Sequence, residues 1–316
     1  MGAGCAADPE AIVRAAVTGL AKRVLFDAGH YARALAERRF PGVAVLCYHA
    51  VLPAGYARAG IPFAQLHVDA DRFAAHCALI AAHCHPVSLA QAEAIWRREV
   101  ESPLRPVLVT FDDGHHVLRD IALPALRRHA VPATIFVCAG PVASGTSFWF
   151  DAMARAAGES AVEAAKALAY DEWRARCEAT GTPSPAGDLL APLAAADIAT
   201  LAAEPLVTLG AHTMTHPILA HAPRSVQQDE IVGSLAAVRG WTGRVPTAFA
   251  YPNGRPGLDY NADTLALLHD AGVTTAFTTG AAWATPDEPP LERSRFVMLD
   301  SIDAAELAHR LCYAWT

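Results

Sequence analysis

Residues 106–114 read Pro-Val-Leu-Val-Thr-Phe-Asp-Asp-Gly, and this stretch of sequence decides the fold. Its apolar first half predicts a buried strand over 106–111, and the carboxylates of Asp112 and Asp113 follow where that strand ends. A second apolar run, Leu-Val-Thr-Leu at 206–209, is followed in the same way by His212 and His216. Parallel α/β folds gather functional side chains at the carboxyl ends of their strands, so we expect these four residues to meet.

The four side chains have the chemistry of metal-assisted hydrolysis. One carboxylate and two imidazoles can bind a divalent cation and leave a position for water, while the second carboxylate acts as a base. On a helical turn, the spacing of His212 and His216 would point both imidazoles the same way. Each motif alone has an ordinary alternative, since Asp-Asp-Gly also forms turns and helix caps and the chain has 14 histidines.

Composition limits the class of protein. The 316 residues contain no Ser/Gly-rich linker, which favours one domain with an insertion. A net charge of −7 argues against nucleic-acid binding. The 7 cysteines, without a Cys-x-x-Cys pair, indicate reduced thiols. No apolar run is long enough for a membrane span and no signal peptide is visible, so we expect a cytoplasmic protein.

Apolar periodicity predicts alternating strands and helices. We expect strands at residues 42–48, 106–111, 133–138, 206–211, 248–251, 274–278 and 295–298. We expect helices at residues 71–82, 89–98, 115–129, 225–241, 263–271 and 304–313. Residues 141–204 are rich in alanine and charge and predict a helical insertion over the site end of the fold. The repeated units indicate either a barrel or a doubly wound sheet.

The N-terminal segment, residues 1–41, is set apart from the domain at 42–316. Residues 11–40 predict one amphipathic helix whose basic residues outnumber Asp27 and Glu37; these are Arg14, Lys22, Arg23, Arg33, Arg38 and Arg39. One interpretation is a helix packed on the domain with solvated arginines. The other is a peripheral helix that contacts anionic lipid.

Three motifs then occur in order along the chain: Thr-Phe-Asp-Asp-Gly at 110–114, His-Thr-x-x-His-Pro at 212–217 and Phe-Ala-Tyr-Pro-Asn-Gly at 249–254. With these motifs, and with Cys-Tyr-His-Ala-Val at 47–51, the chain resembles the NodB-homology polysaccharide deacetylases, carbohydrate esterase family four, over residues 43–298. The resemblance implies a distorted (β/α)7-type barrel that removes N-acetyl groups from amino sugars of a polysaccharide or glycan precursor.

The resemblance also implies roles for individual residues. By position, Asp112 is the general base, and Asp113, His212 and His216 bind a divalent metal. Zinc is the first candidate, and Co2+, Ni2+, Fe2+ and Mn2+ suit the same ligands. The turn at 251–254 is the candidate backbone donor to the oxyanion, and we assign Tyr251, Pro252 and Asn253 to substrate binding.

The sequence departs from the family pattern at two places. Ala250 stands where an arginine usually tunes the base; Arg295, which we also assign to substrate binding, could supply that charge, or could be a surface residue. The usual Leu-x-His strand that donates the general acid is not recognisable, because the matching letters at 307–309 fall in a predicted helix. His49, at the end of the first predicted strand, is therefore our candidate acid, with a structural histidine as the alternative.

Other residues leave alternatives open. Trp149, within Phe-Trp-Phe at 148–150, could stack on a sugar ring or anchor the insertion in the core. The histidines and cysteines at 76–85 form a rival metal cluster, although Cys77 and Cys84 share an apolar helix face. One of His115 and His116 could reach the site.

The function has alternatives as well. The same machinery could remove another acyl group, such as formyl, from a lipid-linked or nucleotide-linked sugar. A catalytically silent carbohydrate-binding protein is a third possibility, which the absence of the motif arginine keeps open.

Overall fold

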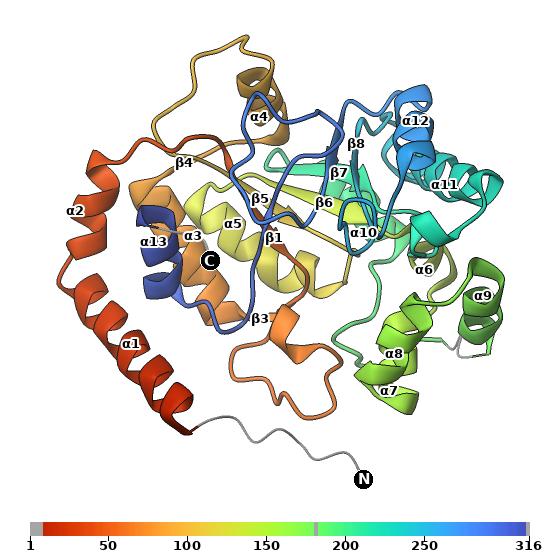
Figure 1. The fold of residues 1–316 in the computed structure, drawn as a ribbon, viewed down its shortest axis with the longest axis horizontal. Coiled ribbons are helices and arrows are strands. Elements are labelled where there is room, and N and C mark those ends of the chain that lie inside the picture. Colours follow the sequence, from red (N-terminus) through yellow and green to blue (C-terminus); the bar gives the residue numbers. More distant parts are fainter. Residues whose placement is uncertain (1–8, 180–182, 314–316) are drawn as a thin grey trace.

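The centre of the protein is a curled sheet of parallel strands (Figure 1). The computed structural model describes residues 9–179 and 183–313, with side chains from residue 17 onward. The sheet has the strand order β10-β1-β5-β6-β7-β8-β9, with β4 paired to the start of β5. Its strands are β1 Ala44–Tyr48, β4 His85–Pro86, β5 Pro106–Phe111, β6 Ala133–Val137, β7 Val207–Ala211, β8 Ala248–Ala250, β9 Thr275–Phe277 and β10 Phe296–Val297.

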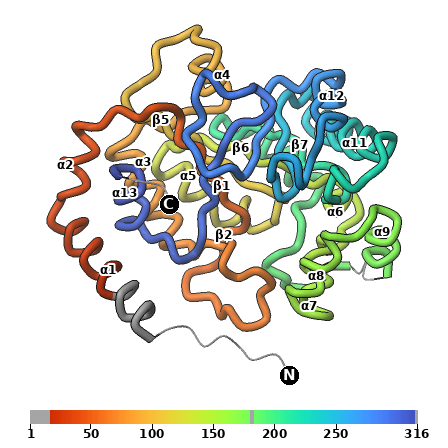
Figure 2. The backbone as a smooth tube through the Cα atoms, viewed as in Figure 1, coloured from red at the N-terminus to blue at the C-terminus, as the bar shows by residue number. Residues whose placement is uncertain are grey.

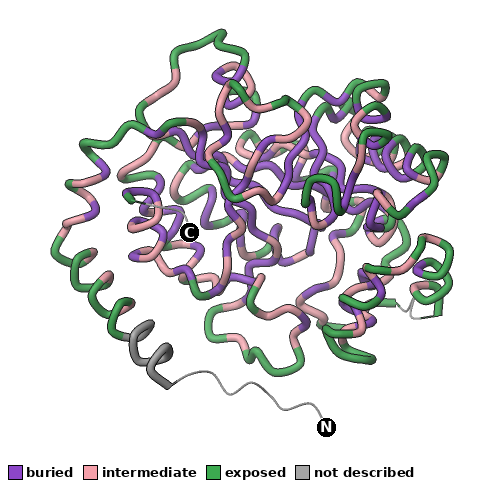
Figure 3. The backbone as a smooth tube through the Cα atoms, viewed as in Figure 1, coloured by how far each residue is buried: buried purple, intermediate pink, exposed green. Residues whose placement is uncertain are grey.

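The strands form because their sequences are continuous apolar runs that can be buried on both faces. Every residue of β1, β5 and β6 is buried, and the buried chain follows the central sheet in Figure 3. The sheet closes irregularly. β10 pairs with β1, while β9 contacts the chain that leads into β10 through a bridge between Phe277 and Arg293. The expected distorted barrel is confirmed, and the doubly wound sheet is excluded.

Helices cover the outside of the sheet. Those between strands or after the last one are α3 Ala70–His83, α4 Leu89–Trp96, α5 Leu123–His129, α11 Arg224–Thr242, α12 Ala262–Asp270 and α13 Ala304–Cys312. The chain also forms three short helical segments: the 3-10 helices η1 Ala64–Leu66 and η3 Leu219–His221, and the π-helix η2 Leu118–Ala122. A small parallel pair, β2 Val51–Leu52 and β3 Val68–Asp69, brackets a long loop that the sequence did not predict.

The stretch predicted as a helical insertion carries α6 Ala139–Ser144, α7 Trp149–Ala157, α8 Glu159–Lys166, α9 Tyr170–Glu178 and α10 Ala195–Ala202. The helix predicted at 115–129 is wrong at its start, since helical turns begin only at Leu118. The reason is tertiary: the backbone N–H of His116 donates to the carbonyl oxygen of Ala191, at the end of the insertion, 2.9 Å away.

The single helix predicted at 11–40 is wrong, because the chain breaks between α1 Pro9–Asp27 and α2 His30–Glu37 at Gly29, whose φ is 71°. Figure 2 shows these helices beside α13. Lys22 forms an ion pair with Glu306 of α13 at 2.5 Å, and Arg23 forms one with Asp303, the N-cap of α13, at 2.9 Å. Both basic side chains are therefore paired within the protein.

The same helix α1 leaves an apolar stripe of Val17, Leu20 and Val24 exposed. Contact of this segment with a membrane surface stays a prediction. None of the described helices combines the length and the apolar character that a membrane span requires.

Gly210 in β7 offers a test of the packing inside the barrel. A Cβ atom there would lie 2.5 Å from the ring of Phe136 and 2.9 Å from the carbonyl oxygen of Ala248. We expect Gly210→Ala to lower the free energy of unfolding by about 1–3 kcal/mol, because the core is already filled. Urea denaturation measures the change.

The matched control is Gly240→Ala in α11, where a Cβ atom would meet nothing within 4 Å. There the substitution should leave stability unchanged or raise it by up to about 1 kcal/mol, since alanine favours helix. Equal destabilisation by both substitutions would contradict the packing described for β7.

Candidate active site

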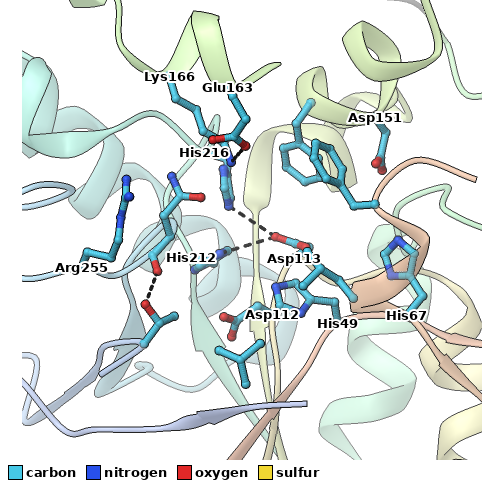
Figure 4. A pocket seen from close by; sticks show the side chains of 16 residues that line it. His49, His67, Asp112, Asp113, Asp151, Glu163, Lys166, His212, His216 and Arg255 are labelled. Atoms are coloured by element: carbon cyan, nitrogen blue, oxygen red, sulfur yellow. Dashed lines mark hydrogen bonds and ion pairs between the residues drawn. The ribbon is translucent and has the colours of Figure 1, made fainter. Parts of the chain in front are cut away.

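The four residues singled out in the sequence meet at the carboxyl ends of neighbouring strands (Figure 4). Asp112 and Asp113 follow β5, and His212 follows β7, with β6 between the two strands. Oδ1 of Asp113 lies 3.5 Å from Nε2 of His212 and 3.5 Å from Nε2 of His216. Within the described residues, these three side chains are the one group whose potential metal-ligating atoms all lie within 4.8 Å of one another.

The histidines converge through a strained turn, and the expected helical turn is wrong. Residues 212–216 are non-helical, and Thr213 and His216 have φ values of 63° and 61°. Asp113 also has a left-handed φ, of 71°. Such conformations cost energy and persist where surrounding contacts impose them. Here the Thr213 hydroxyl accepts a hydrogen bond from the His216 N–H at 3.0 Å and fixes the turn.

The three facing atoms are all lone-pair donors to a cation. Nδ1 of His212 donates to the carbonyl oxygen of Ala250 at 2.7 Å, so Nε2 is the nitrogen that presents a lone pair when the ring is neutral. Burial, and then neighbouring His212, lower the pKa of His216 to about 3, so its imidazole is neutral. Oδ1 of Asp113 is buried and accepts no hydrogen bond. This donor set therefore fits a divalent metal ion.

Glu230 of α11 holds the turn that carries both histidines. Its Oε2 accepts hydrogen bonds from the backbone N–H groups of Met214 and Thr215, each at 2.8 Å, and its Oε1 accepts one from the Thr215 hydroxyl. Nothing in the sequence distinguishes this glutamate from other helical acids, so sequence reasoning missed it.

His115 supports the carboxylate ligand from behind. Its Nε2 lies 3.5 Å from Oδ2 of Asp113, while its Nδ1 donates to the carbonyl oxygen of Leu190 at 3.0 Å. His116 turns away and bonds to the carbonyl oxygen of Asp188. Of the two histidines considered in the sequence, His115 is thus the one that reaches the site.

The candidate base Asp112 is paired with a buried arginine. Nη1 and Nη2 of Arg295 donate to its two carboxylate oxygens at 2.7 and 2.8 Å. Burial raises the pKa of Asp112, but Arg295 and His212 outweigh it and hold the pKa below its usual value. Asp112 is therefore ionised, and Arg295 supplies the charge that Ala250 lacks.

Several residues that the sequence assigned to substrate binding do not line the pocket in this structure. Arg295 is 0% exposed and lines no part of the pocket. Tyr251 is buried, with its hydroxyl donating to the carbonyl oxygen of Leu291, and neither Tyr251 nor Pro252 lines the pocket.

Trp149 is a core anchor whose Nε1 donates to the carbonyl oxygen of His216 at 3.0 Å. Asn253 alone of that group lines the pocket.

The proposed oxyanion turn is largely occupied by internal hydrogen bonds. The N–H of Tyr251 donates to the carbonyl oxygen of Phe277, and that of Gly254 donates to the carbonyl oxygen of Pro252. Both N–H groups are thus already used within the protein, and Pro252 has no N–H at all. None of these three residues supplies the backbone donor that the sequence suggested. Asn253, with a φ of 55°, is the residue of this turn that faces the pocket.

The contacts of the remaining histidines show which of them lie at the site. His49 lines the pocket, and its buried Nδ1 has no hydrogen-bond partner. His309 lies on α13 and bonds to the hydroxyl of Tyr31. His76, from the rival cluster, is held between the hydroxyl of Tyr48 and the carbonyl oxygen of Ile302, at 3.1 and 2.9 Å, and is structural.

The site lies at the bottom of a pocket of about 320 Å³. The loop before β3 contributes one wall and the inserted helices another, where Phe150 of the aromatic run at 148–150 lines the pocket. The lining residues that sequence reasoning missed include Phe63, His67, Asp151, Glu163, Lys166 and Arg255. The two walls touch, because the N–H of Phe63 donates to Glu159 at 2.7 Å and Lys166 lies over the Phe63 ring. No motif marks these residues, since only the fold brings the two segments together.

Residues 99–276 match the family model described as polysaccharide deacetylase, which is more than half of the chain. The chain belongs to the polysaccharide deacetylase family. The resemblance drawn from its motifs is therefore confirmed at the level of the family. No curated protein matches this family member in sequence.

Solved structures share the fold of this polysaccharide deacetylase family member. IcaB from Ammonifex degensii has a TM-score of 0.62 and 21% identity, over 87% of this chain and 98% of its own. The Streptococcus pyogenes deacetylase PplD in complex with acetate has a TM-score of 0.59 and 19% identity, over 85% and 98%. A de-N-acetylase from Aggregatibacter actinomycetemcomitans has a TM-score of 0.60 and 14% identity, over 84% and 98%. At these identities, the likeness concerns the fold.

The role of Glu230 can be tested with two substitutions. We expect Glu230→Leu to weaken metal binding by about 10–100-fold, because the turn carrying His212 and His216 loses its anchor. Glu230→Gln should retain most of the affinity, since its amide oxygen can still accept the two backbone N–H groups and the Thr215 hydroxyl can accept from its NH2 group. Competition with a chromogenic chelator measures the affinities, and equal losses in both variants would contradict this role.

The pair of Asp112 and Arg295 predicts a double-mutant result. Arg295→Met leaves the Asp112 carboxylate buried without its partner and should lower the free energy of unfolding by about 3–5 kcal/mol. Adding Asp112→Asn removes that unpaired charge, so the double variant should be more stable than Arg295→Met alone. Urea denaturation decides; a double variant no more stable than the single one would show that the charge is not what destabilises it.

Proposed function

We propose that the protein is a metal-dependent hydrolase that removes N-acetyl groups from amino sugars of a polysaccharide or glycan precursor. The observation that carries this proposal is the buried convergence of Asp113, His212 and His216 beside an ionised Asp112, at the bottom of a pocket. Membership of the family implies an acetylated carbohydrate as the substrate.

In this proposal the chain supplies the metal ligands, the base and the acid for amide hydrolysis. A divalent cation held by Asp113, His212 and His216 would, when bound, polarise the acyl carbonyl and make a water molecule more acidic. Asp112, kept ionised by Arg295, accepts the proton of the attacking water. Asp112 acts as the base because both of its oxygens are already oriented by one guanidinium.

Departure of the amine requires a proton, and His49 is placed to donate it. It lines the pocket beside both aspartates, and its Nδ1 makes no internal hydrogen bond. Burial holds the pKa of His49 below its usual value, against the opposing charges of Asp113 and Asp112, so His49 must gain a proton during the reaction before it can donate one. Pocket walls that carry Phe63 and Phe150 provide apolar surface for the faces of a sugar ring and exclude water.

The pairing of Asp112 argues against a protein that only binds carbohydrate. A silent binding module gains nothing from a buried base whose charge is maintained by a buried arginine. Removal of another acyl group, such as formyl, or action on a lipid-linked or nucleotide-linked sugar uses the same residues; comparing acyl donors in the assay below separates these reactions.

The decisive experiment measures acetate release from an N-acetylated oligosaccharide with and without a chelator. We expect release that the chelator abolishes and that added zinc, cobalt or another divalent ion restores. Asp112→Asn should lose turnover and keep its metal, since Asp112 is not a ligand, whereas His212→Ala should lose both. Elemental analysis measures the metal.

His221→Ala, at an exposed position outside the pocket, is the matched control and should keep both metal and activity. Acetate release that is insensitive to complete metal removal, or equal metal loss from Asp112→Asn and His212→Ala, would refute the assignment.

A further inference from the structure

One wall of the pocket carries two buried polar side chains that the proposed reaction does not use. These are His67, which directly precedes β3, and Asp151, in the first turn of α7. They are 4% and 1% exposed, and both line the pocket. In Figure 4 they lie on the same side, away from His212.

The hydrogen-bonding state of His67 follows from its contacts. Its Nε2 lies 3.1 Å from the carbonyl oxygen of Pro62, which only accepts, so Nε2 carries the proton. Burial, and then the nearby His115 and His49, hold the pKa of His67 well below its usual value and keep the ring neutral. Its Nδ1 therefore carries a lone pair, and this nitrogen is buried without a hydrogen-bond partner.

Asp151 presents the complementary group. Its Oδ2 is also buried without a hydrogen-bond partner. Burial raises the pKa of Asp151 to about 7, against the opposing effect of His115. Its carboxyl group can therefore accept or donate a hydrogen bond, whereas Nδ1 of His67 can only accept.

A metal ion is not the occupant of this wall. Among the described residues, only Asp113, His212 and His216 bring three ligating atoms within 4.8 Å of one another, so His67 and Asp151 belong to no such group. An apolar occupant would leave both polar atoms unsatisfied, which costs free energy. A hydroxyl group, which can donate and accept, suits either of these atoms. Phe63, Leu66 and Phe150 in the same pocket suit the apolar faces of a sugar ring.

We propose that His67 and Asp151 form a specificity subsite that binds a ring hydroxyl of the amino sugar whose amide reacts beside Asp113. This inference rests on the proposed function and adds the feature by which the substrate is selected. A sugar with a free hydroxyl at that position is accepted.

The test compares an N-acetylhexosaminide with its 3-deoxy, 4-deoxy and 6-deoxy analogues. We expect the wild-type protein to favour the parent over one analogue by about tenfold or more in kcat/KM, since a buried hydrogen-bonding site rejects a ligand that lacks the group. In Asp151→Ala and in His67→Phe, this preference should fall to within about twofold, because the group that reads the hydroxyl is gone. Each ratio is measured on one preparation, so partial unfolding of a variant cancels.

Asp171→Asn is the control: it lies on α9 of the same insertion, is exposed and does not line the pocket. It should keep the wild-type preference. If the wild-type protein shows no preference for any hydroxyl, or if both subsite variants keep it, the inference is overturned and water alone fills this wall, while acetate release still supports the proposed function.

If no substrate releases acetate, the proposed function fails, and the subsite is judged by direct binding. Calorimetric titration of the metal-loaded protein with the parent sugar and its deoxy analogues gives the same ratios without turnover. A preference of about tenfold that disappears in both subsite variants supports the subsite; equal binding of all the sugars overturns it.

Discussion

Three atoms with lone pairs point at one another in the centre of this protein, and the rest of the site depends on that arrangement. Oδ1 of Asp113 lies 3.5 Å from Nε2 of His212 and 3.5 Å from Nε2 of His216, and Oδ1 accepts no hydrogen bond. Such an arrangement is unfavourable until a cation lies between the atoms. Glu230 and the carbonyl oxygen of Ala250 hold the two imidazoles in it. Positive φ at Asp113 and His216 shows that the surrounding fold imposes the geometry.

The sequence predicted which side chains meet better than it predicted the geometry that holds them. Runs of apolar residues located the principal strands, and the order of parallel strands then required Asp113 and His212 to meet. The turn at 212–216 could not be predicted, because its left-handed residues and its anchor Glu230 depend on contacts with α11. Arg295 was predicted to approach Asp112 only because Ala250 stands where the family usually has an arginine. Its complete burial could not be predicted, because it depends on how β10 pairs with β1.

The inserted segment shows why the pocket escaped prediction. Phe148 packs on His115, Trp149 bonds to the backbone of His216 and Phe150 packs on the His216 ring. Asp151, next in the chain, faces the pocket. Four consecutive residues thus serve the site in four different ways. An aromatic run in the sequence indicates burial or sugar contact. It does not show which of its residues is buried and which faces the pocket, because that depends on the tertiary contacts of each side chain.

Arg295 also bridges the irregular closure of the barrel. Its Nε donates to the carbonyl oxygen of Thr278, just beyond β9, while its other nitrogens reach Asp112 beyond β5. The guanidinium that pairs with Asp112 is thus part of the joint between β9 and the chain that enters β10. Thermal opening of that joint would withdraw the arginine from Asp112, so the ion pair beside the candidate metal site and the closure of the barrel would be lost together.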